Sequence, residues 1–217
     1  MASALIDPQG NSMKLYFAPD ACSLAPHIVL RELAIPFTLV RVNNRSKRCA
    51  DGEDFYRINP KGYVAALQLD DGNVITEGPA IVQYLADQRP ESRLAPPPTA
   101  FERVRLQEWL NFITSEIHAG AAPLFNDALP EDAKALLRDK LRRRLGYLAQ
   151  ALAQQTYLLG TYFSVADAYL FTVLRWMARF EISLSEWPPL QHYVTRIAVR
   201  ASVRAALEAE ATSEQVK

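Results

Sequence analysis

The amino-acid sequence predicts an α/β domain followed by an all-α domain. Three observations lead to this expectation. Short strand-like runs alternate with helix-spaced segments over the first ninety residues, and helical periodicity dominates everything after Ala100. Between these parts, Pro96, Pro97 and Pro98 cannot continue a helix and stiffen the backbone. We therefore expect a flexible leader over residues 1–12, an α/β domain over 13–91, a Pro-rich linker over 92–99 and an all-helical domain over 100–217.

The first elements predict a βαβ unit. Residues 14–17 and 37–42 are typical of short strands, and residues 23–33 between them carry apolar side chains at helical spacing. Two strands joined by a crossover helix are expected to run parallel. A polar, charged connection follows over residues 43–59.

A hairpin and a second helix complete the predicted α/β domain. The turn residues Asp71-Gly72 lie between the apolar runs V-A-A-L-Q-L and V-I-T, which indicates a β-hairpin. Residues 79–87 then predict a helix with a proline in its first turn. The expected result is a mixed four-stranded sheet with helices.

The second half predicts a helical domain around one central helix. Five leucines at spacings of three or four residues give one helix a single buried stripe; they are Leu137, Leu141, Leu145, Leu148 and Leu152. The segment 164–180 is apolar nearly all round, which is typical of a central helix. Ser164-x-x-Asp167 before it predicts a capping box.

Composition excludes several classes of function. Lys and Arg number 24 and Asp and Glu number 24, so the chain lacks the basic footprint of a nucleic-acid-binding protein. No apolar run approaches the length of a membrane span. Two cysteines in 217 residues exclude a disulfide scaffold and indicate a reducing compartment. The three histidines lack ligand spacing, so we expect no metal site.

Cys22 is the first candidate for chemistry, because it directly precedes the first predicted helix. A helix start stabilises an anion, so we expect the pKa of this thiol to be lowered and its thiolate to be nucleophilic. Cys22 lacks the second cysteine of a C-x-x-C redox pair. The alternative is a buried structural thiol, and Cys49 is interpreted in that way.

A second candidate is Thr76-Glu77-Gly78-Pro79, at the start of the next predicted helix. Backbone N–H groups there could bind a carboxylate, and Glu77 could bind an ammonium group. Together they would suit the amino-acid end of a zwitterion. The alternative is an ordinary helix start with an acidic residue.

These residues, read together, resemble a bacterial glutathione S-transferase of the beta class. The resemblance covers the chain from Met13 onward and rests on the blocks A-C-S-L-A-P-H, N-P-K-G-Y-V-A-A-L, T-E-G-P-A-I-V-Q-Y-L-A-D, E-W-L-N-F-I-T-S-E-I-H and F-S-V-A-D-A-Y-L-F. It implies a thioredoxin-like N-terminal domain, a helical C-terminal domain and a cytoplasmic homodimer that serves in detoxification. It also implies glutathione as co-substrate, bound in a cleft between the domains, and a small hydrophobic electrophile as second substrate.

The resemblance also implies roles for individual residues of the first domain. Cys22 matches the cysteine that faces the glutathione sulfur and can form a mixed disulfide with it, and Ser23 is its hydroxyl neighbour. Glu77 and Gly78 match the positions that hold the γ-glutamyl end. Val64 matches the residue whose backbone pairs with the peptide.

Four further positions carry over in the same way. Lys47 matches a basic residue near the glycyl end of glutathione. Asn111, Glu116 and His118 match polar residues that the helical domain contributes near the sulfur or across the dimer interface.

The sequence departs from the family pattern at three positions. Ala65 stands where the family has a cis-proline, Phe17 stands where a tyrosine is frequent, and Ala119 stands where a lysine is frequent. A cis bond before a residue other than proline costs roughly 3–4 kcal/mol, so we expect Val64–Ala65 to be trans. Side chains alternate across a strand, so Tyr16 should face away from Phe17.

Three functional hypotheses follow from these residues. The first is a glutathione transferase, with a possible thiol-transferase activity through a mixed disulfide at Cys22. The second, suggested by the three departures, is a protein of the same fold that binds apolar ligands or a protein partner without transferase activity. The third is a reductase that acts by thiol–disulfide exchange.

Overall fold

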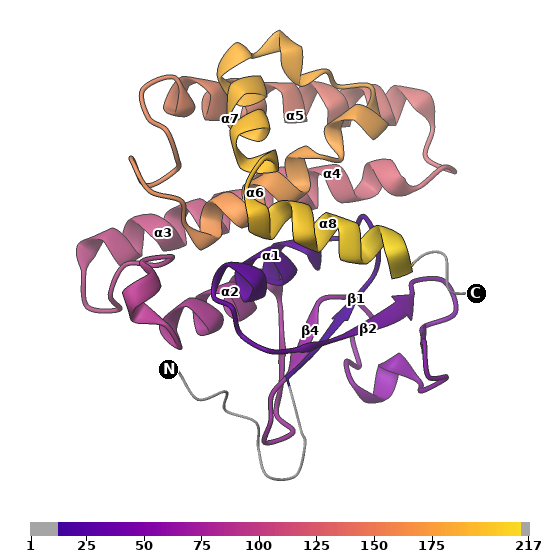
Figure 1. Cartoon of the computed structure of the whole chain (residues 1–217). Coiled ribbons are helices and arrows are strands. Elements are labelled where there is room, and N and C mark those ends of the chain that lie inside the picture. Colours follow the sequence, from indigo (N-terminus) through magenta and orange to yellow (C-terminus); the bar gives the residue numbers. More distant parts are fainter. Residues whose placement is uncertain (1–12, 214–217) are drawn as a thin grey trace. The chain divides into compact units, whose positions relative to one another are not determined.

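The computed structural model describes residues 13–213, so the predicted leader over residues 1–12 lies outside the described residues. Contacts between residues divide the chain into two compact units (Figure 1). The first unit contains the described residues up to Arg89 together with those from Ala201 onward, and the second unit contains Pro90–Arg200. Each unit is described by itself.

The elements of the first unit follow the predicted order. They are β1 (Lys14–Phe17), α1 (Leu24–Glu32), β2 (Thr38–Asn43), β3 (Arg48–Cys49), the 3-10 helix η1 (Phe55–Arg57), β4 (Ala66–Gln68), β5 (Val74–Thr76), α2 (Gly78–Asp87) and, from the end of the chain, α8 (Ala201–Ser213). The strands at 14–17 and 74–76 are confirmed to the residue.

The sheet has five strands in the order β3-β2-β1-β4-β5. β1 and β2 are parallel, as the βαβ pattern predicts, while β4 pairs antiparallel with both β1 and β5. The expected count of four strands was wrong, because β3 lies in the polar connection. β3 has two residues and pairs antiparallel with β2, and so short a strand has no apolar pattern of its own.

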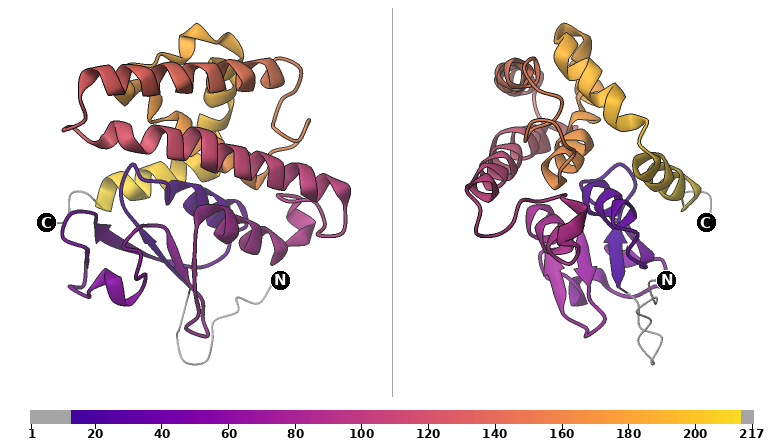
Figure 2. Two further views of the ribbon diagram at one scale, coloured as in Figure 1. Left: turned by 180° about the vertical axis from the view of Figure 1, so that it is seen from behind. Right: turned by 60° about the vertical axis from the view of Figure 1, so that its left-hand side comes forward.

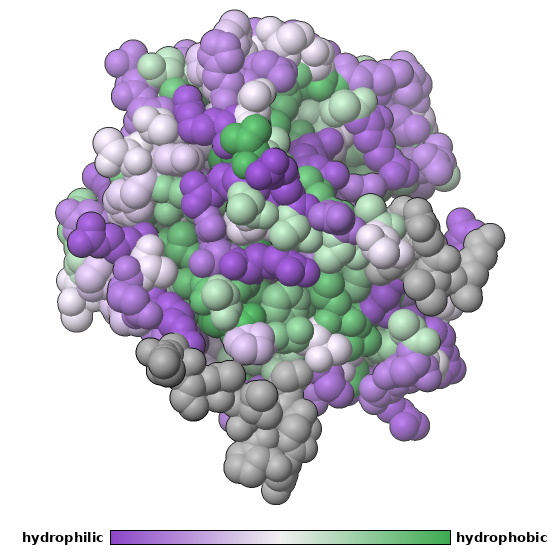
Figure 3. All heavy atoms as spheres, in the orientation of Figure 1, coloured by the Kyte–Doolittle hydropathy of each residue, from purple (hydrophilic) through white to green (hydrophobic). Residues whose placement is uncertain are grey.

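Both faces of the sheet are packed. The ring of Phe17 lies 6.4 Å from the ring of His27 in α1, whereas the ring of Tyr16 lies 5.8 Å from that of Phe55 in η1. The expected alternation of Tyr16 and Phe17 is therefore confirmed. On the face shown in Figure 3, apolar side chains gather over the strands of the first unit, in keeping with the partial burial of β2.

The C-terminal helix α8 packs against α1 within the first unit. A buried pair joins them: His27 Nδ1 lies 2.9 Å from Glu210 Oε1. By their contacts, residues 201–213 belong to the first unit. The sequence instead predicts them as part of the helical domain over 100–217. The reason is a tertiary contact that no local pattern indicates.

The second unit is helical. Its elements are α3 (Phe101–Phe112), α4 (Ala119–Ala121), α5 (Glu131–Leu152), α6 (Val165–Leu174) and α7 (Pro188–Ala198), with the short helices η2 (Pro90–Ser92), η4 (Ala122–Phe125), η5 (Met177–Phe180) and η6 (Leu184–Glu186). A π-helical segment, η3 (Ile113–His118), joins α3 to α4. Figure 2 shows the long stretch from α3 to α4 running beside α5.

The central helix α6 is confirmed, since all ten of its residues are buried. The predicted capping box is also present. The Ser164 N–H and hydroxyl donate to Asp167 Oδ2 at 2.8 and 2.7 Å, while the Leu158 N–H and the Tyr193 hydroxyl donate to Oδ1, both at 2.9 Å. Burial raises the pKa of Asp167, and these hydrogen bonds oppose the increase. One carboxylate thus connects α6, α7 and the loop after α5.

The proline-rich segment is attached to the second unit. The Val165 N–H donates to the Leu94 carbonyl at 2.9 Å, and Arg103 Nε donates to the Pro96 carbonyl at 2.8 Å. The three prolines are not part of an α-helix, as predicted. The two hydrogen bonds hold the segment to α3 and α6 of the second unit.

Candidate functional site

Cys22 and Val64 meet in the first unit. Cys22 lies two residues before α1 and is partly buried, and its Sγ donates to the Val64 carbonyl oxygen at 3.1 Å. The loop after β1 and the loop before β4 therefore converge on the thiol.

The expected lowering of the Cys22 pKa is wrong. Burial raises the pKa of this thiol to about 11. Hydrogen bonds from the backbone N–H groups of Cys22 and Ala65 lower the pKa by less than burial raises it, and the negative charge of Glu77 raises it further. The helix start is outweighed by desolvation. The Ala65 N–H is a donor that a proline at this position would lack.

The expected trans geometry of Val64–Ala65 is also wrong, because this peptide bond is cis. The expectation used only the local preference of a non-proline residue. Both residues are buried, with relative exposures of 8% and 5%, so tertiary packing decides the geometry here.

Ser23 does not present its hydroxyl to the thiol. Its side chain is fully buried, and its Oγ both donates to the Ala18 carbonyl and accepts from the Ala18 N–H, each at 3.2 Å. This side chain therefore fixes the loop between β1 and α1.

Glu77 and Gly78 form the start of α2. Glu77 has a φ of 71°, and its carbonyl accepts from the N–H groups of Ala80 and Ile81. A non-glycine residue with positive φ is uncommon, and such residues cluster at functional sites. The Glu77 side chain is 67% exposed and accepts a hydrogen bond from Lys61 Nζ. Its carboxylate is thus accessible to a ligand.

The loop of residues 59–64 contacts three of the predicted site residues of the first unit, Cys22, Lys47 and Glu77. Lys61 binds Glu77, Val64 accepts from Cys22, and the ring centre of Tyr63 lies 5.5 Å from Lys47 Nζ. Sequence reasoning missed Lys61 and Tyr63. Their signal was the block N-P-K-G-Y-V, but their partners lie far away in the chain.

The second unit holds the other predicted residues. Asn111 is exposed on α3, and Glu116 and His118 lie in the π-helical segment η3. Such segments are rare and frequently occur at functional sites. The structure therefore holds the predicted residues as two sets, one in each unit.

The side chains of Glu116 and His118 each have specific partners that sequence reasoning missed. His118 Nδ1 lies 2.6 Å from the Tyr169 hydroxyl, and the ring of Trp176 lies 5.0 Å from the His118 ring. Arg144 Nε donates to Glu116 Oε2 at 2.6 Å, which lowers the pKa of Glu116. These partners come from α5, α6 and the residues after α6, so only the fold reveals them.

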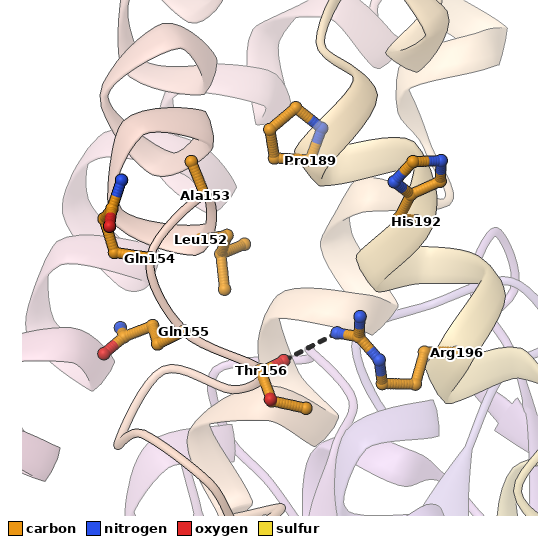
Figure 4. A pocket seen from close by; sticks show the side chains of 8 residues that line it. All are labelled: Leu152, Ala153, Gln154, Gln155, Thr156, Pro189, His192 and Arg196. Atoms are coloured by element: carbon orange, nitrogen blue, oxygen red, sulfur yellow. Dashed lines mark hydrogen bonds between the residues drawn. The ribbon is translucent and has the colours of Figure 1, made fainter.

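Other features give no competing site. Within residues 13–213 there is no group of three side chains able to hold a metal ion, and no helix is long and apolar enough to cross a membrane. A depression in the second unit is lined from the end of α5 and from α7 (Figure 4). There Arg196 Nη1 donates to the Thr156 carbonyl at 2.8 Å, and none of the predicted site residues lines it.

Comparisons with known proteins identify a family for both parts of the chain. Residues 21–88 match the family model of the glutathione S-transferase N-terminal domain, and residues 112–201 match that of the C-terminal domain. The chain is 46% identical over 198 residues to glutathione S-transferase GstA of Escherichia coli O157:H7, covering 91% of this chain and 98% of that protein.

Solved structures give the same result. The ternary complex of BphK, a bacterial GST, superposes with a TM-score of 0.90 at 53% identity, covering 91% of this chain and 99% of that one. A sphingomonad glutathione S-transferase complexed with glutathione gives a TM-score of 0.89 at 44% identity, covering 91% and 98%. A bacterial beta-class enzyme from Sphingomonas chungbukensis gives 0.88 at 45% identity, with the same coverage of 91% and 98%. With both domains matched in order, the chain belongs to the bacterial glutathione S-transferase family.

Proposed function

We propose that this protein transfers glutathione to small hydrophobic electrophiles and binds the tripeptide along the loop of residues 59–64. The observation that carries this proposal is the contact of that loop with Cys22, Lys47 and Glu77. In this arrangement Glu77 and the N–H groups at the start of α2 take the γ-glutamyl end. The Val64 backbone pairs with the peptide, and Lys47 takes the glycyl carboxylate.

The chemistry is a nucleophilic substitution or addition by sulfur. The glutathione thiol loses its proton, the sulfur lone pair attacks the electrophilic carbon, and a C–S bond forms as any leaving group departs with its bonding electrons. A polar site near a helix start favours the thiolate of the substrate. No cofactor beyond the co-substrate glutathione takes part in this scheme.

We assign Cys22 a supporting role in this step. With a pKa of about 11, its thiol stays protonated near neutral pH and serves as a hydrogen-bond donor. Ser23 is a positioning residue, because its hydroxyl is bound to Ala18. The same raised pKa argues against a thiol–disulfide reductase as the main activity, since exchange requires a thiolate. Mixed-disulfide formation at Cys22 is accordingly proposed only as a slow side activity.

Residues of the second unit are proposed to assist the transfer. His118 is assigned to the reacting sulfur, while Asn111 and Glu116 are assigned to glutathione binding. For Glu116 and His118 the support is the family match over residues 112–201 together with the π-helical segment that carries both residues. For Asn111 it is the resemblance of the block E-W-L-N-F-I-T.

We further propose a homodimer in the cytoplasm. Phe101 and Val104 on α3 and Tyr147 on α5 are 65%, 46% and 52% exposed, and aromatic side chains are enriched at protein interfaces. Free thiols at Cys22 and Cys49 suit a reducing compartment. Light scattering coupled to size-exclusion chromatography tests the dimer, and a mass of one chain would contradict it.

Retention on immobilised glutathione, calorimetric binding and a conjugation assay with an aryl chloride test the activity. We expect binding and turnover in the wild type, and at least about tenfold weaker binding in Glu77→Gln, which loses a charge-assisted contact. Glu91→Gln, at an exposed position of the chain, is the matched control. Neither binding nor turnover at millimolar glutathione would favour the alternative, a binding protein without transferase activity.

A further inference from the structure

The ion pair between Lys61 and Glu77 places a cation of the protein on the carboxylate assigned to the ligand. Lys61 Nζ donates to Glu77 Oε1 and also to the Thr76 hydroxyl, the latter at 2.7 Å. The residue before Glu77 therefore helps to hold the lysine ammonium at the start of α2. A protonated amino group of a ligand carries the same positive charge and the same hydrogen-bond donors as the lysine ammonium.

The backbone of Lys61 is fixed, whereas its side chain reaches solvent. Asn59 is buried, with its Oδ1 accepting from the Lys61 N–H at 3.1 Å and its Nδ2 donating to the Tyr63 carbonyl at 2.6 Å. Gly62 has a φ of 71°, and a Cβ there would lie 2.6 Å from a ring carbon of Tyr56. The Lys61 and Glu77 side chains are 50% and 67% exposed, so the lysine can swing away while its loop stays in place.

We propose that Lys61 is a resident counter-cation of Glu77, which the ammonium group of the γ-glutamyl ligand must displace. This proposal rests on the proposed function. Two ammonium groups on one carboxylate would repel each other, so the ligand and Lys61 compete for Glu77. The competition lowers the affinity for a ligand with an amino group and leaves an analogue without that group unaffected.

The magnitude of the effect is set by the exposure of the pair. Exposed ion pairs contribute little, which corresponds to a change of about two- to fivefold in a dissociation constant. Lys61 therefore adjusts the affinity for the amino group of the ligand and has no effect on the binding of the rest of the tripeptide.

Calorimetric titration with two ligands tests the proposal. The ligands are glutathione and the analogue in which a glutaryl group replaces γ-glutamyl, so that only the amino group is missing. Three variants are compared with the wild type. They are Lys61→Met, Lys61→Arg, which keeps the charge, and Lys14→Met, which removes an exposed lysine from β1. Thermal melting checks that each variant is folded.

We expect Lys61→Met to bind glutathione about two- to fivefold more tightly and to bind the glutaryl analogue with unchanged affinity. Lys61→Arg and Lys14→Met should keep wild-type affinity for glutathione. Weaker binding of both ligands by Lys61→Met would make Lys61 a ligand-binding residue and overturn the proposal, as would equal changes for both ligands or no change for either. Failure of the wild type to bind glutathione would instead overturn the proposed function, and the displacement with it.

Discussion

The thiol of Cys22 donates a hydrogen bond to the carbonyl oxygen of Val64, 3.1 Å away. This bond joins two loops that are separated in the chain by α1, β2, β3 and η1. A thiol that donates is a protonated thiol, so the geometry and the raised pKa of Cys22 agree. The bond identifies Cys22 as a hydrogen-bond donor at neutral pH.

Alkylation of Cys22 by iodoacetamide should therefore depend steeply on pH. Only the thiolate reacts, and with a pKa of about 11 it amounts to about one part in a thousand at pH 8. We expect the rate to rise about tenfold per pH unit up to pH 10. Mass spectrometry in a Cys49→Ala background measures it, because Cys49 is also a thiol with a pKa of about 11. A rate that levels off below pH 9 would restore the lowered pKa expected from the helix start.

Most of the fold was predictable from the sequence because local patterns specify it. The strand-like run at residues 14–17 placed β1, and the Asp71-Gly72 turn before V-I-T placed β5. The spacing of Ser164 and Asp167 placed the start of α6. These features depend on neighbours within a few residues. β3 was missed because two residues carry no periodic pattern.

The candidate site was predictable only in part, because its chemistry depends on distant residues. Cys22 and Glu77 were predicted from their places at helix starts, and Val64 was predicted from the family resemblance. The pairing of Lys61 with Glu77 and the effect of burial on Cys22 arise when loops far apart in the chain meet. Burial in particular reversed the sign of a pKa shift that the helix start alone had predicted.

Tyr169→Phe should lower the rate of transfer if His118 acts at the sulfur. The substitution removes the 2.6 Å hydrogen bond to His118 Nδ1 and leaves the ring in place. We expect kcat to fall by about three- to tenfold, with an altered pH profile and an unchanged KM for glutathione. Tyr162→Phe, at an exposed tyrosine of the same unit, is the control. Equal kcat values and pH profiles in the two variants would remove Tyr169 from the positioning of His118.

Glu210→Ala should loosen α8. His27 Nδ1 lies 2.9 Å from the Glu210 carboxylate, and Arg31 Nε donates to His27 Nε2 at 3.2 Å, so the ring proton faces Glu210. Removing a buried acceptor leaves that donor unsatisfied and should destabilise the protein by about 2–3 kcal/mol. The rate of amide hydrogen exchange should increase more in α8 and α1 than in α7. Exposed Glu208 lies on the same helix, and a Glu208→Ala variant with equal exchange would contradict the role of the pair.

Asp167→Ala should be the most destabilising of these substitutions. The carboxylate accepts four hydrogen bonds from three neighbours, and its loss leaves the donors of Ser164, Leu158 and Tyr193 without this acceptor in a buried site. We expect at least about 3 kcal/mol of lost stability, seen as a lower thermal midpoint, and a smaller loss in Asp167→Asn, which keeps one oxygen acceptor. Asp139→Ala on α5 is the control, because Asp139 is exposed. If Asp167→Ala melted within a degree or so of that control, the capping box would not stabilise the second unit, and the burial of α6 alone would have to account for its stability.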